Sequence, residues 1–191
     1  MSSLQNFPIV LASNSPRRHQ ILSDAGFNYS IKSFNVEEIY PDHLRAEEIP
    51  LYLAKLKAAP TLNELGDAML IGADTIVWLD NQVLGKPTDE EDAFQILFKL
   101  SGRTHEVITG VYLYRNGVEN TFYDITKVTF RDLSNEEIRG YIKKYKPMDK
   151  AGAYGIQDWI GLTTVRKIEG CYYNVMGLPM PKLYPYLIAK F

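Results

Sequence analysis

The sequence predicts an α/β fold with a largely buried sheet, and three observations support this prediction. Residues 68–79 form an almost continuous apolar run in which Ile76 and Val77 favour a buried strand over a helix. Residues 88–100 carry apolar side chains at helical spacing. Segments of these two kinds alternate along the chain, which is typical of helices packed against a sheet.

The first third of the chain predicts a strand, a polar loop and two helices. Residues 7–12 form a short apolar run. Ser15 followed by Pro16 is typical of a helix start, with serine as the cap and proline at the first helical position. A second helix is expected to begin near Pro50 and to stop before Pro60. Its buried stripe is expected to consist of Leu53, Leu56 and Ala59.

The rest of the chain contains further helix signals with recognisable starts. Thr88 and Glu91 form a capping box for the helix of the apolar, helically spaced segment. Ser134 and Glu137 form another, for a helix that runs to about Lys144. Residues 105–115 and 121–130 are predicted to be two strands around an Asn-Gly turn. Residues 165–191 are predicted to contain a strand followed by a proline-containing helix.

Composition places the chain among folded domains of moderate size. It has 191 residues, 46% of them hydrophobic, and a formal net charge of −2. These values exclude a disordered chain and argue against a protein that coats a polyanion. Apolar runs stay well below the roughly 18 residues of a membrane span. We therefore expect one domain over residues 1–191, with no membrane and no nucleic acid as partner.

Cysteine usage and the first residues favour a cytoplasmic setting. Cys171 is the only cysteine, so an internal disulfide and a multi-cysteine zinc site are both excluded. Residues 1–7 lack the basic segment and the long apolar stretch of a secretion signal. The histidines, His19, His43 and His105, fit no zinc-binding spacing.

Asp74 is the most informative single residue. It lies inside an apolar strand, where a carboxylate must be paired, bound to a metal or hydrogen-bonded. Small neighbours, Gly72 and Ala73, leave room for a ligand. A structural aspartate that caps a neighbouring loop is the alternative, but the pattern favours a functional group.

Residues 13–18 combine hydroxyl groups, backbone amides at a helix start and two guanidinium groups. This combination suits a phosphate group. The segment lacks the glycines and the Lys-Ser/Thr pair of a Walker loop, so an ordinary helix cap with solvated arginines is an equal alternative.

Further candidates are cations and a carboxylate pair. Lys86 lies on a short stiff segment before a helix, and Lys57 and Lys150 add positive charge, although most lysines are merely solvated. Glu37 and Glu38 would supply a second carboxylate to a divalent cation, since magnesium takes one or two carboxylates together with phosphate and water. A solvated acidic loop is the alternative.

These pieces together closely resemble the Maf family of nucleoside triphosphate pyrophosphatases. The motifs that carry the resemblance are residues 11–18 (LASNSPRR), 53–58 (LAKLKA), 72–77 (GADTIV), 84–87 (LGKP), 100–111 (LSGRTHEVITGV) and 149–157 (DKAGAYGIQ). They occur in one order over nearly the whole chain, which makes a chance match negligible.

The resemblance implies an elongated, mixed, twisted sheet flanked by helices, with two lobes around a deep cleft as in inosine triphosphatases. It implies a divalent cation, Mg²⁺ or Mn²⁺, and frequently a homodimer. The reaction implied is hydrolysis between the α and β phosphates of a nucleoside triphosphate. The residues implied in it are Asp74 as proton acceptor, Ser13, Arg18, Lys57 and Lys86 on the triphosphate, and Glu38 with Asp74 at the metal.

Three positions bear on the choice of base. At Arg17, Thr75 and Gln157 the chain resembles the dTTP and UTP branch of the family rather than the 7-methyl-GTP branch. Gln157 offers both a donor and an acceptor to a uracil or thymine edge. Residues 158–160 differ from the small residues expected there. We take Arg17, Thr75, Lys150 and Gln157 as substrate-binding candidates beside the triphosphate contacts.

The sequence thus predicts a house-cleaning hydrolase of dTTP and UTP, with modified pyrimidine nucleotides as further substrates. A nucleotide-binding regulator of cell division without turnover and a 7-methyl-GTP pyrophosphatase are the competing hypotheses. The presence of Asp74, Lys57 and Lys86 together favours an enzyme.

Overall fold

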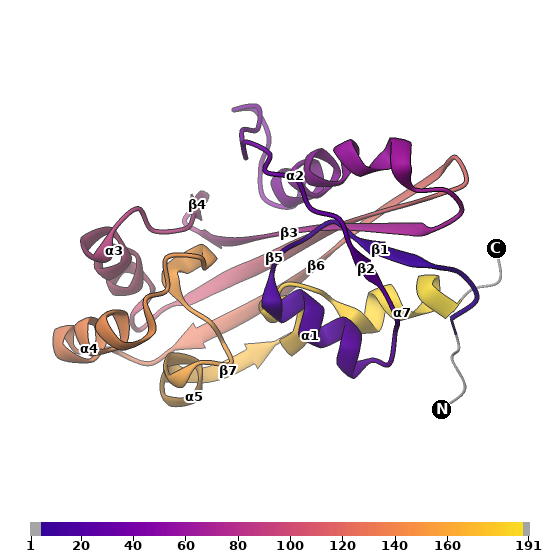
Figure 1. The fold of residues 1–191 in the computed structure, drawn as a ribbon. Coiled ribbons are helices and arrows are strands. Elements are labelled where there is room, and N and C mark those ends of the chain that lie inside the picture. Colours follow the sequence, from indigo (N-terminus) through magenta and orange to yellow (C-terminus); the bar gives the residue numbers. More distant parts are fainter. Residues whose placement is uncertain (1–4, 189–191) are drawn as a thin grey trace. The chain divides into compact units, whose positions relative to one another are not determined.

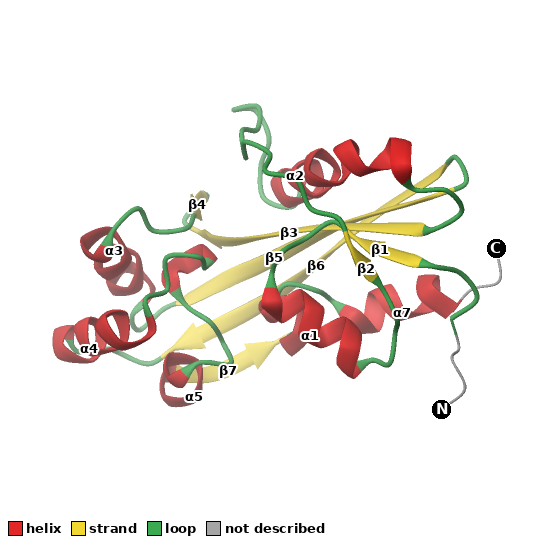
Figure 2. Ribbon diagram, viewed as in Figure 1, coloured by secondary structure: helices red, strands yellow, loops and turns green. Residues whose placement is uncertain are grey.

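The computed structural model describes residues 5–188 (Figure 1). The expected domain limits at 1 and 191, and the last residues of the predicted C-terminal helix, lie outside this part. Within it, a seven-stranded mixed sheet has the order β2-β1-β3-β5-β6-β7, with β4 paired to β3, and helices flank the sheet (Figure 2). This confirms the predicted mixed α/β architecture.

The elements match most of the predicted segments. The strands are β1 (Ile9–Leu11), β2 (Ser30–Ile31), β3 (Met69–Leu79), β4 (Gln82–Leu84), β5 (Thr104–Arg115), β6 (Val118–Phe130) and β7 (Val165–Glu169). The helices are α1 (Pro16–Asp24), α2 (Glu48–Ala58), α3 (Glu90–Leu100), α4 (Asn135–Tyr145), α5 (Trp159–Thr164), α6 (Tyr172–Met176) and α7 (Met180–Ile188), with 3₁₀ turns η1 (Ala59–Glu64) and η2 (Ala151–Ala153).

The chain forms two compact units, which share the long strands. The first contains the described residues up to Asp74, then Thr109–Asp124, and those from Gly177 onward. The second contains Thr75–Ile108 and Ile125–Met176. The single-domain organisation and the cleft between two lobes stay predictions.

In the first unit, β1 pairs in parallel with both β2 and β3. Leu11 lies opposite Ile31 on one side and Ile71 on the other. Helix α2 covers one face of this part of the sheet, and α1 and α7 cover the other (Figures 1 and 2). Because β1 and β3 are parallel and Leu11 pairs with Ile71, the residues that follow Leu11 and Ile71 lie at the same end of this strand pair.

Helix α2 begins two residues earlier than predicted, and its buried stripe differs. The buried side chains are Ile49, Pro50, Leu53, Ala54 and Ala58. Leu56 is half-buried and Ala59 is exposed, so the predicted stripe is wrong at these two positions. The small side chains of Ala54 and Ala58 allow α2 to lie close to β3, where Gly72 has no side chain to oppose them.

In the second unit, β3 and β4 form an antiparallel hairpin, and β6 pairs antiparallel with β7. The hairpin turn is Asp80–Asn81, and both residues have positive φ, 52° and 60°. This backbone matches the twist of the two strands. Helices α3 and α4 pack together, and the Arg139 guanidinium lies 4.2 Å from the centre of the Phe94 ring.

One predicted cap is confirmed and one is wrong. Ser134 and Glu137 make both hydrogen bonds of a capping box at the start of α4. At α3 the cap is Asp89, whose side chain accepts the N–H of Asp92, and not Thr88. The adjacent Asp89 carboxylate binds a first-turn amide, while the Thr88 N–H donates to the Asp92 carboxylate.

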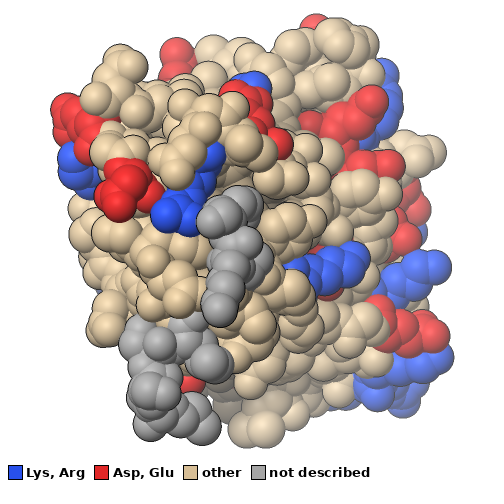
Figure 3. Space-filling view, turned by 90° about the vertical axis from the view of Figure 1, so that its right-hand side faces the viewer, with Lys and Arg blue, Asp and Glu red and all other residues tan. Residues whose placement is uncertain are grey.

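Charges of both signs share the surface. On the face drawn in Figure 3, Lys and Arg side chains lie beside Asp and Glu side chains rather than in a continuous basic stripe. This distribution fits the net charge of −2. In the described part of the chain, every helix is too short or too polar to cross a bilayer.

Candidate active site

Asp74 lies on β3 with 5% of its surface exposed. Its Oδ1 accepts a hydrogen bond from Lys57 Nζ on α2, at 2.5 Å. The same ammonium lies 3.0 Å from Oε1 of Glu38, in the irregular segment before α2. The structure thus brings two carboxylates and one ammonium, all predicted as site residues, to a single point.

A glycine explains why α2 and β3 meet at this point. A Cβ atom at Gly72 would collide with the Ala54 carbonyl oxygen and the Ala58 side chain. Gly72 and Asp74 lie two residues apart on a strand and therefore face the same side of the sheet. Without a side chain at Gly72, α2 approaches closely and places Lys57 over Asp74.

Ser13 and Arg18 form the second part of this arrangement, at the junction of β1 and α1. The Ser13 hydroxyl oxygen accepts the Ser15 N–H and a hydrogen bond from Arg18 Nη1, both at 3.2 Å. Arg18 Nε donates to the carbonyl of Gly177 at 2.7 Å. The Arg18 side chain is therefore anchored at both ends of its planar group, next to the start of a helix.

The charges of the first unit act on one another. Burial lowers the pKa of the Arg18 guanidinium, and the negative charge of Asp74 opposes this effect. The neighbouring Arg17 also lowers this pKa, whereas Glu38 raises it. These cations and carboxylates therefore act on one another. Together with the Ser13 hydroxyl they form what we call the Asp74 cluster: Ser13, Arg17, Arg18, Glu38, Lys57 and Asp74.

The Asp74 cluster combines the kinds of groups that are suited to binding and hydrolysing a phosphate ester or anhydride. Guanidinium and ammonium groups, with the N-terminus of α1, stabilise phosphate charge. Asp74 is a nearly buried carboxylate, a group whose chemistry suits a proton acceptor. Oδ1 of Asp74 and Oε1 of Glu38 both contact the Lys57 ammonium, so the two carboxylates lie close together. Two carboxylates fit a magnesium ion that completes its coordination with phosphate and water.

The other predicted residues belong to the second unit. Thr75 follows Asp74 on β3 and is half-buried, while Lys86 is exposed between β4 and α3. Next to Lys86, the Gly85 carbonyl accepts the Gly152 N–H at 3.0 Å, which ties this segment to η2. The structure therefore holds the Lys86 segment in place within its own unit.

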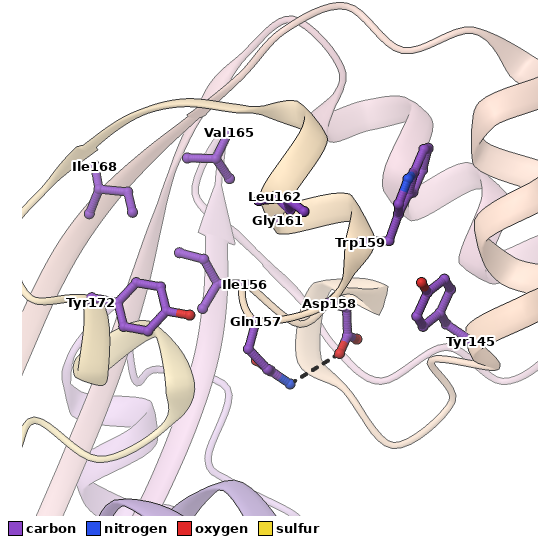
Figure 4. A pocket seen from close by; sticks show the side chains of 10 residues that line it. All are labelled: Tyr145, Ile156, Gln157, Asp158, Trp159, Gly161, Leu162, Val165, Ile168 and Tyr172. Carbon is purple, nitrogen blue, oxygen red and sulfur yellow. Dashed lines mark hydrogen bonds between the residues drawn. The ribbon is translucent and has the colours of Figure 1, made fainter.

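Lys150 and Gln157 lie close to one another within the second unit. Lys150, 12% exposed, contacts the carboxylates of Asp149 at 3.1 Å and Asp158 at 3.7 Å. Gln157 Nε2 donates to Asp158 Oδ1 at 3.3 Å. Gln157 and Asp158 line a pocket of about 560 Å³ together with Tyr172 (Figure 4).

Sequence reasoning missed three residues that contact or surround the candidates. Gly177 binds Arg18 from 159 residues away, and no local pattern marks it. Tyr141 and Asp158, joined by a hydrogen bond of 3.1 Å, were not candidates. The one available signal was the unexpected acidic residue directly after Gln157.

Comparison with known proteins finds similar sequences over almost the whole chain. A protein named dTTP/UTP pyrophosphatase from Phocaeicola vulgatus is 56% identical over 186 residues, covering 96% of each chain. Proteins of the same name from Flavobacterium johnsoniae and Cytophaga hutchinsonii are 52% and 51% identical over 96% of this chain, covering 95% and 84% of theirs. The model of the family described as Maf-like protein matches residues 8–190. The chain belongs to the Maf family.

Proposed function

We propose that the protein is a nucleoside triphosphate pyrophosphatase that hydrolyses dTTP and UTP to the monophosphate and pyrophosphate. The observation that carries the proposal is the convergence of Asp74, Lys57 and Glu38 beside Arg18 and Ser13 in the first unit. The choice of dTTP and UTP is supported by the names of the relatives.

Binding of the triphosphate is the task of the cations. Arg18 and Lys57 neutralise phosphate charge, and the Ser13 hydroxyl and the α1 N-terminus add hydrogen-bonding groups. Arg17, Lys86 and Lys150 are further proposed contacts of the nucleotide. Neutralisation matters because the triphosphate repels an attacking oxygen and the leaving pyrophosphate gathers negative charge.

Asp74 acts as the proton acceptor for the attacking water. The water oxygen forms a bond to phosphorus, the anhydride bond between the α and β phosphates breaks, and pyrophosphate leaves with the bonding electron pair. The water proton goes to the Asp74 carboxylate. Lys57 holds this carboxylate in one orientation through the bond to Oδ1.

A divalent cation, Mg²⁺ or Mn²⁺, is the proposed cofactor, and Asp74 and Glu38 would hold it. When bound, such an ion supplies charge stabilisation at the phosphate oxygens and lowers the pKa of a bound water. In residues 5–188 no group of three or more His, Cys, Asp and Glu side chains forms a metal site. Two carboxylates leave the remaining coordination positions to the substrate and to water.

The proposed function also indicates a cellular role, a domain organisation and an oligomeric state. A house-cleaning enzyme that removes nucleotides, modified pyrimidine nucleotides among them, before polymerases use them would work in the cytoplasm. We also propose a single functional domain, supported by one family match over residues 8–190. A homodimer is proposed as well, and sedimentation velocity of the purified protein tests it.

Pyrophosphate release by the purified protein is the decisive experiment. It is measured with magnesium or manganese for dTTP, UTP, CTP, GTP, ITP and 7-methyl-GTP, with Asp74→Asn as the matched variant. We expect dTTP and UTP to be hydrolysed fastest, and kcat to fall about 10²- to 10⁴-fold in the variant, the usual contribution of a general base. Near-normal kcat in the variant would remove Asp74 from the reaction.

Two other outcomes identify the competing hypotheses. Preference for 7-methyl-GTP would mean that Arg17, Thr75 and Gln157 do not select a pyrimidine. Stoichiometric nucleotide binding without pyrophosphate release would favour a regulatory protein. The first outcome leaves the reaction type intact, whereas the second overturns it.

A further inference from the structure

A tight turn holds Gln157 and Asp158 together in the second unit. The Asp158 N–H donates to the Gly155 carbonyl at 3.0 Å, and helix α5 begins directly after Asp158. A Cβ at Gly155 would lie 2.7 Å from both Asp158 Oδ2 and Gln157 Nε2. The turn therefore packs the two side chains against a residue that has none.

Asp158 is fixed from two further sides. The Tyr141 hydroxyl, on α4, donates to Oδ2 at 3.1 Å, and Lys150 Nζ lies 3.7 Å from the same oxygen. The Tyr141 oxygen in turn accepts the Gly155 N–H at 3.4 Å. With 17% of its side chain exposed, Asp158 is a largely buried carboxylate with partners on both oxygens.

The carboxylate determines which way the Gln157 amide points. An ionised carboxylate only accepts hydrogen bonds, so the Gln157 nitrogen, and not its oxygen, must face Asp158 Oδ1. The amide O and N positions, which are normally interchangeable, are thereby distinguished by chemistry. Figure 4 shows the Gln157 nitrogen turned toward an Asp158 oxygen. Gln157 is exposed and lines the pocket, and this bond sets the order in which its other N–H and its C=O are presented there.

We propose that Asp158 is a positioning residue for base selection: it orients the Gln157 amide so that this edge pairs with uracil and thymine in preference to cytosine. The inference rests on the proposed function, because it names how the same enzyme chooses its substrate. Uracil and thymine present an N3–H donor between two carbonyl acceptors. The Gln157 C=O accepts this N3–H, and its N–H donates to a neighbouring carbonyl.

Cytosine reverses the pattern at the centre of that edge. Its N3 is an acceptor, and an amino group replaces the C4 carbonyl. A Gln157 amide held in one orientation would place its oxygen against the N3 lone pair. An amide that is free to turn over would instead donate to N3 and accept from the amino group, so release of Gln157 should admit cytosine.

The test compares kcat/KM for UTP and CTP in the full-length protein and in Asp158→Asn. Asparagine has the same shape, but it both donates and accepts, so it no longer dictates the orientation of Gln157. We expect the UTP/CTP ratio to fall at least tenfold, mainly through KM, with kcat for UTP within about threefold of the wild type. An unchanged ratio, or an equal loss for both nucleotides, would overturn the proposal.

Three further variants separate positioning from general damage. Asp149→Asn removes the other carboxylate that contacts Lys150 but leaves the Gln157 contact, so its UTP/CTP ratio should equal that of the wild type. Gln157→Ala should abolish the preference. Tyr141→Phe removes one anchor of Asp158 and should lower the ratio in the same direction, which keeps the proposal testable if Asp158→Asn does not fold.

Failure of this proposal is distinguishable from failure of the proposed function. A wild-type protein that releases no pyrophosphate from any nucleotide contradicts the function itself. A wild-type protein that hydrolyses UTP and CTP equally well, or a Gln157→Ala variant with an unchanged ratio, contradicts the roles of Gln157 and Asp158 in base selection but leaves the reaction itself intact.

Discussion

A Cβ atom on Gly72 would lie 2.5 Å from the carbonyl oxygen of Ala54, so these two residues set how closely α2 approaches β3. The obstacle is backbone, which cannot rotate aside as a flexible side chain does. We expect Gly72→Ala to lower the free energy of unfolding by about 1–3 kcal/mol, the usual cost of overpacking. Because α2 carries Lys57, kcat should fall too.

Gly140 provides the matched control for this substitution. It lies inside α4, and a Cβ there would meet nothing within 4 Å. Gly140→Ala should therefore raise the free energy of unfolding by about 0.5–1 kcal/mol, since alanine favours a helix. Urea unfolding of both variants checks the pair. Equal effects of the same sign would contradict the predicted close contact at Gly72.

The pair of Lys57 and Asp74 should show strong coupling in a double-mutant cycle. Lys57→Met leaves a nearly buried carboxylate without its ammonium, which should cost about 3 kcal/mol of unfolding free energy. Once Asp74→Asn has removed the charge, the same Lys57 substitution should cost about 1–3 kcal/mol less. Additive effects in urea unfolding would mean that the two groups do not interact in solution.

Arg18→Lys should destabilise the first unit although it keeps the positive charge. The guanidinium reaches the Gly177 carbonyl and the Ser13 hydroxyl from two different nitrogens, and a lysine has only one nitrogen, so we expect at least one of these bonds to be lost. One partner left unsatisfied costs about 1–3 kcal/mol. Thermal and urea unfolding measure the loss, with Arg17→Lys, at a half-exposed position, as the comparison. A larger loss for Arg17→Lys would refute this account.

His105 should make the fold sensitive to acid. It is 1% exposed, and burial lowers its pKa from 6.5 to about 3, so the folded protein keeps it neutral while the unfolded chain takes up a proton below pH 6.5. The neutral His105 side chain therefore makes its full contribution to the free energy of unfolding above pH 6.5. Between pH 6.5 and 3 this contribution declines by about 1.4 kcal/mol per pH unit.

The variant His105→Gln checks this slope. Glutamine keeps a polar group for the Tyr154 hydroxyl, which lies 2.8 Å from His105 Nε2, but it does not titrate. Urea unfolding free energies from pH 4 to 8 should therefore decline less steeply toward acid than those of the wild type. Parallel curves would show that His105 does not carry the effect.

Local patterns predicted the elements well, because helix caps and apolar periodicity act over a few residues. The capping box at Ser134 is an example. The cap at α3 was misplaced by one residue because Thr88 and Asp89 are adjacent and either side chain suits a helix start.

The contacts of the candidate site were predictable only in part. The sequence singled out Asp74 because a carboxylate in an apolar strand needs a partner. It could not identify Lys57 as that partner, since the two residues meet only through the packing of α2 on β3. Asp158 depends likewise on Tyr141, which comes from another helix and gives no signal in the sequence.

The bare turn residue Gly155 links a third position to the preference for a base. A Cβ atom there would lie 2.7 Å from Asp158 Oδ2 and from Gln157 Nε2, which are the ends of side chains that can rotate aside. A substitution at this position would therefore move both groups while residues 157 and 158 keep their identity. A directed-evolution library for new bases should accordingly cover codon 155 together with codons 157 and 158.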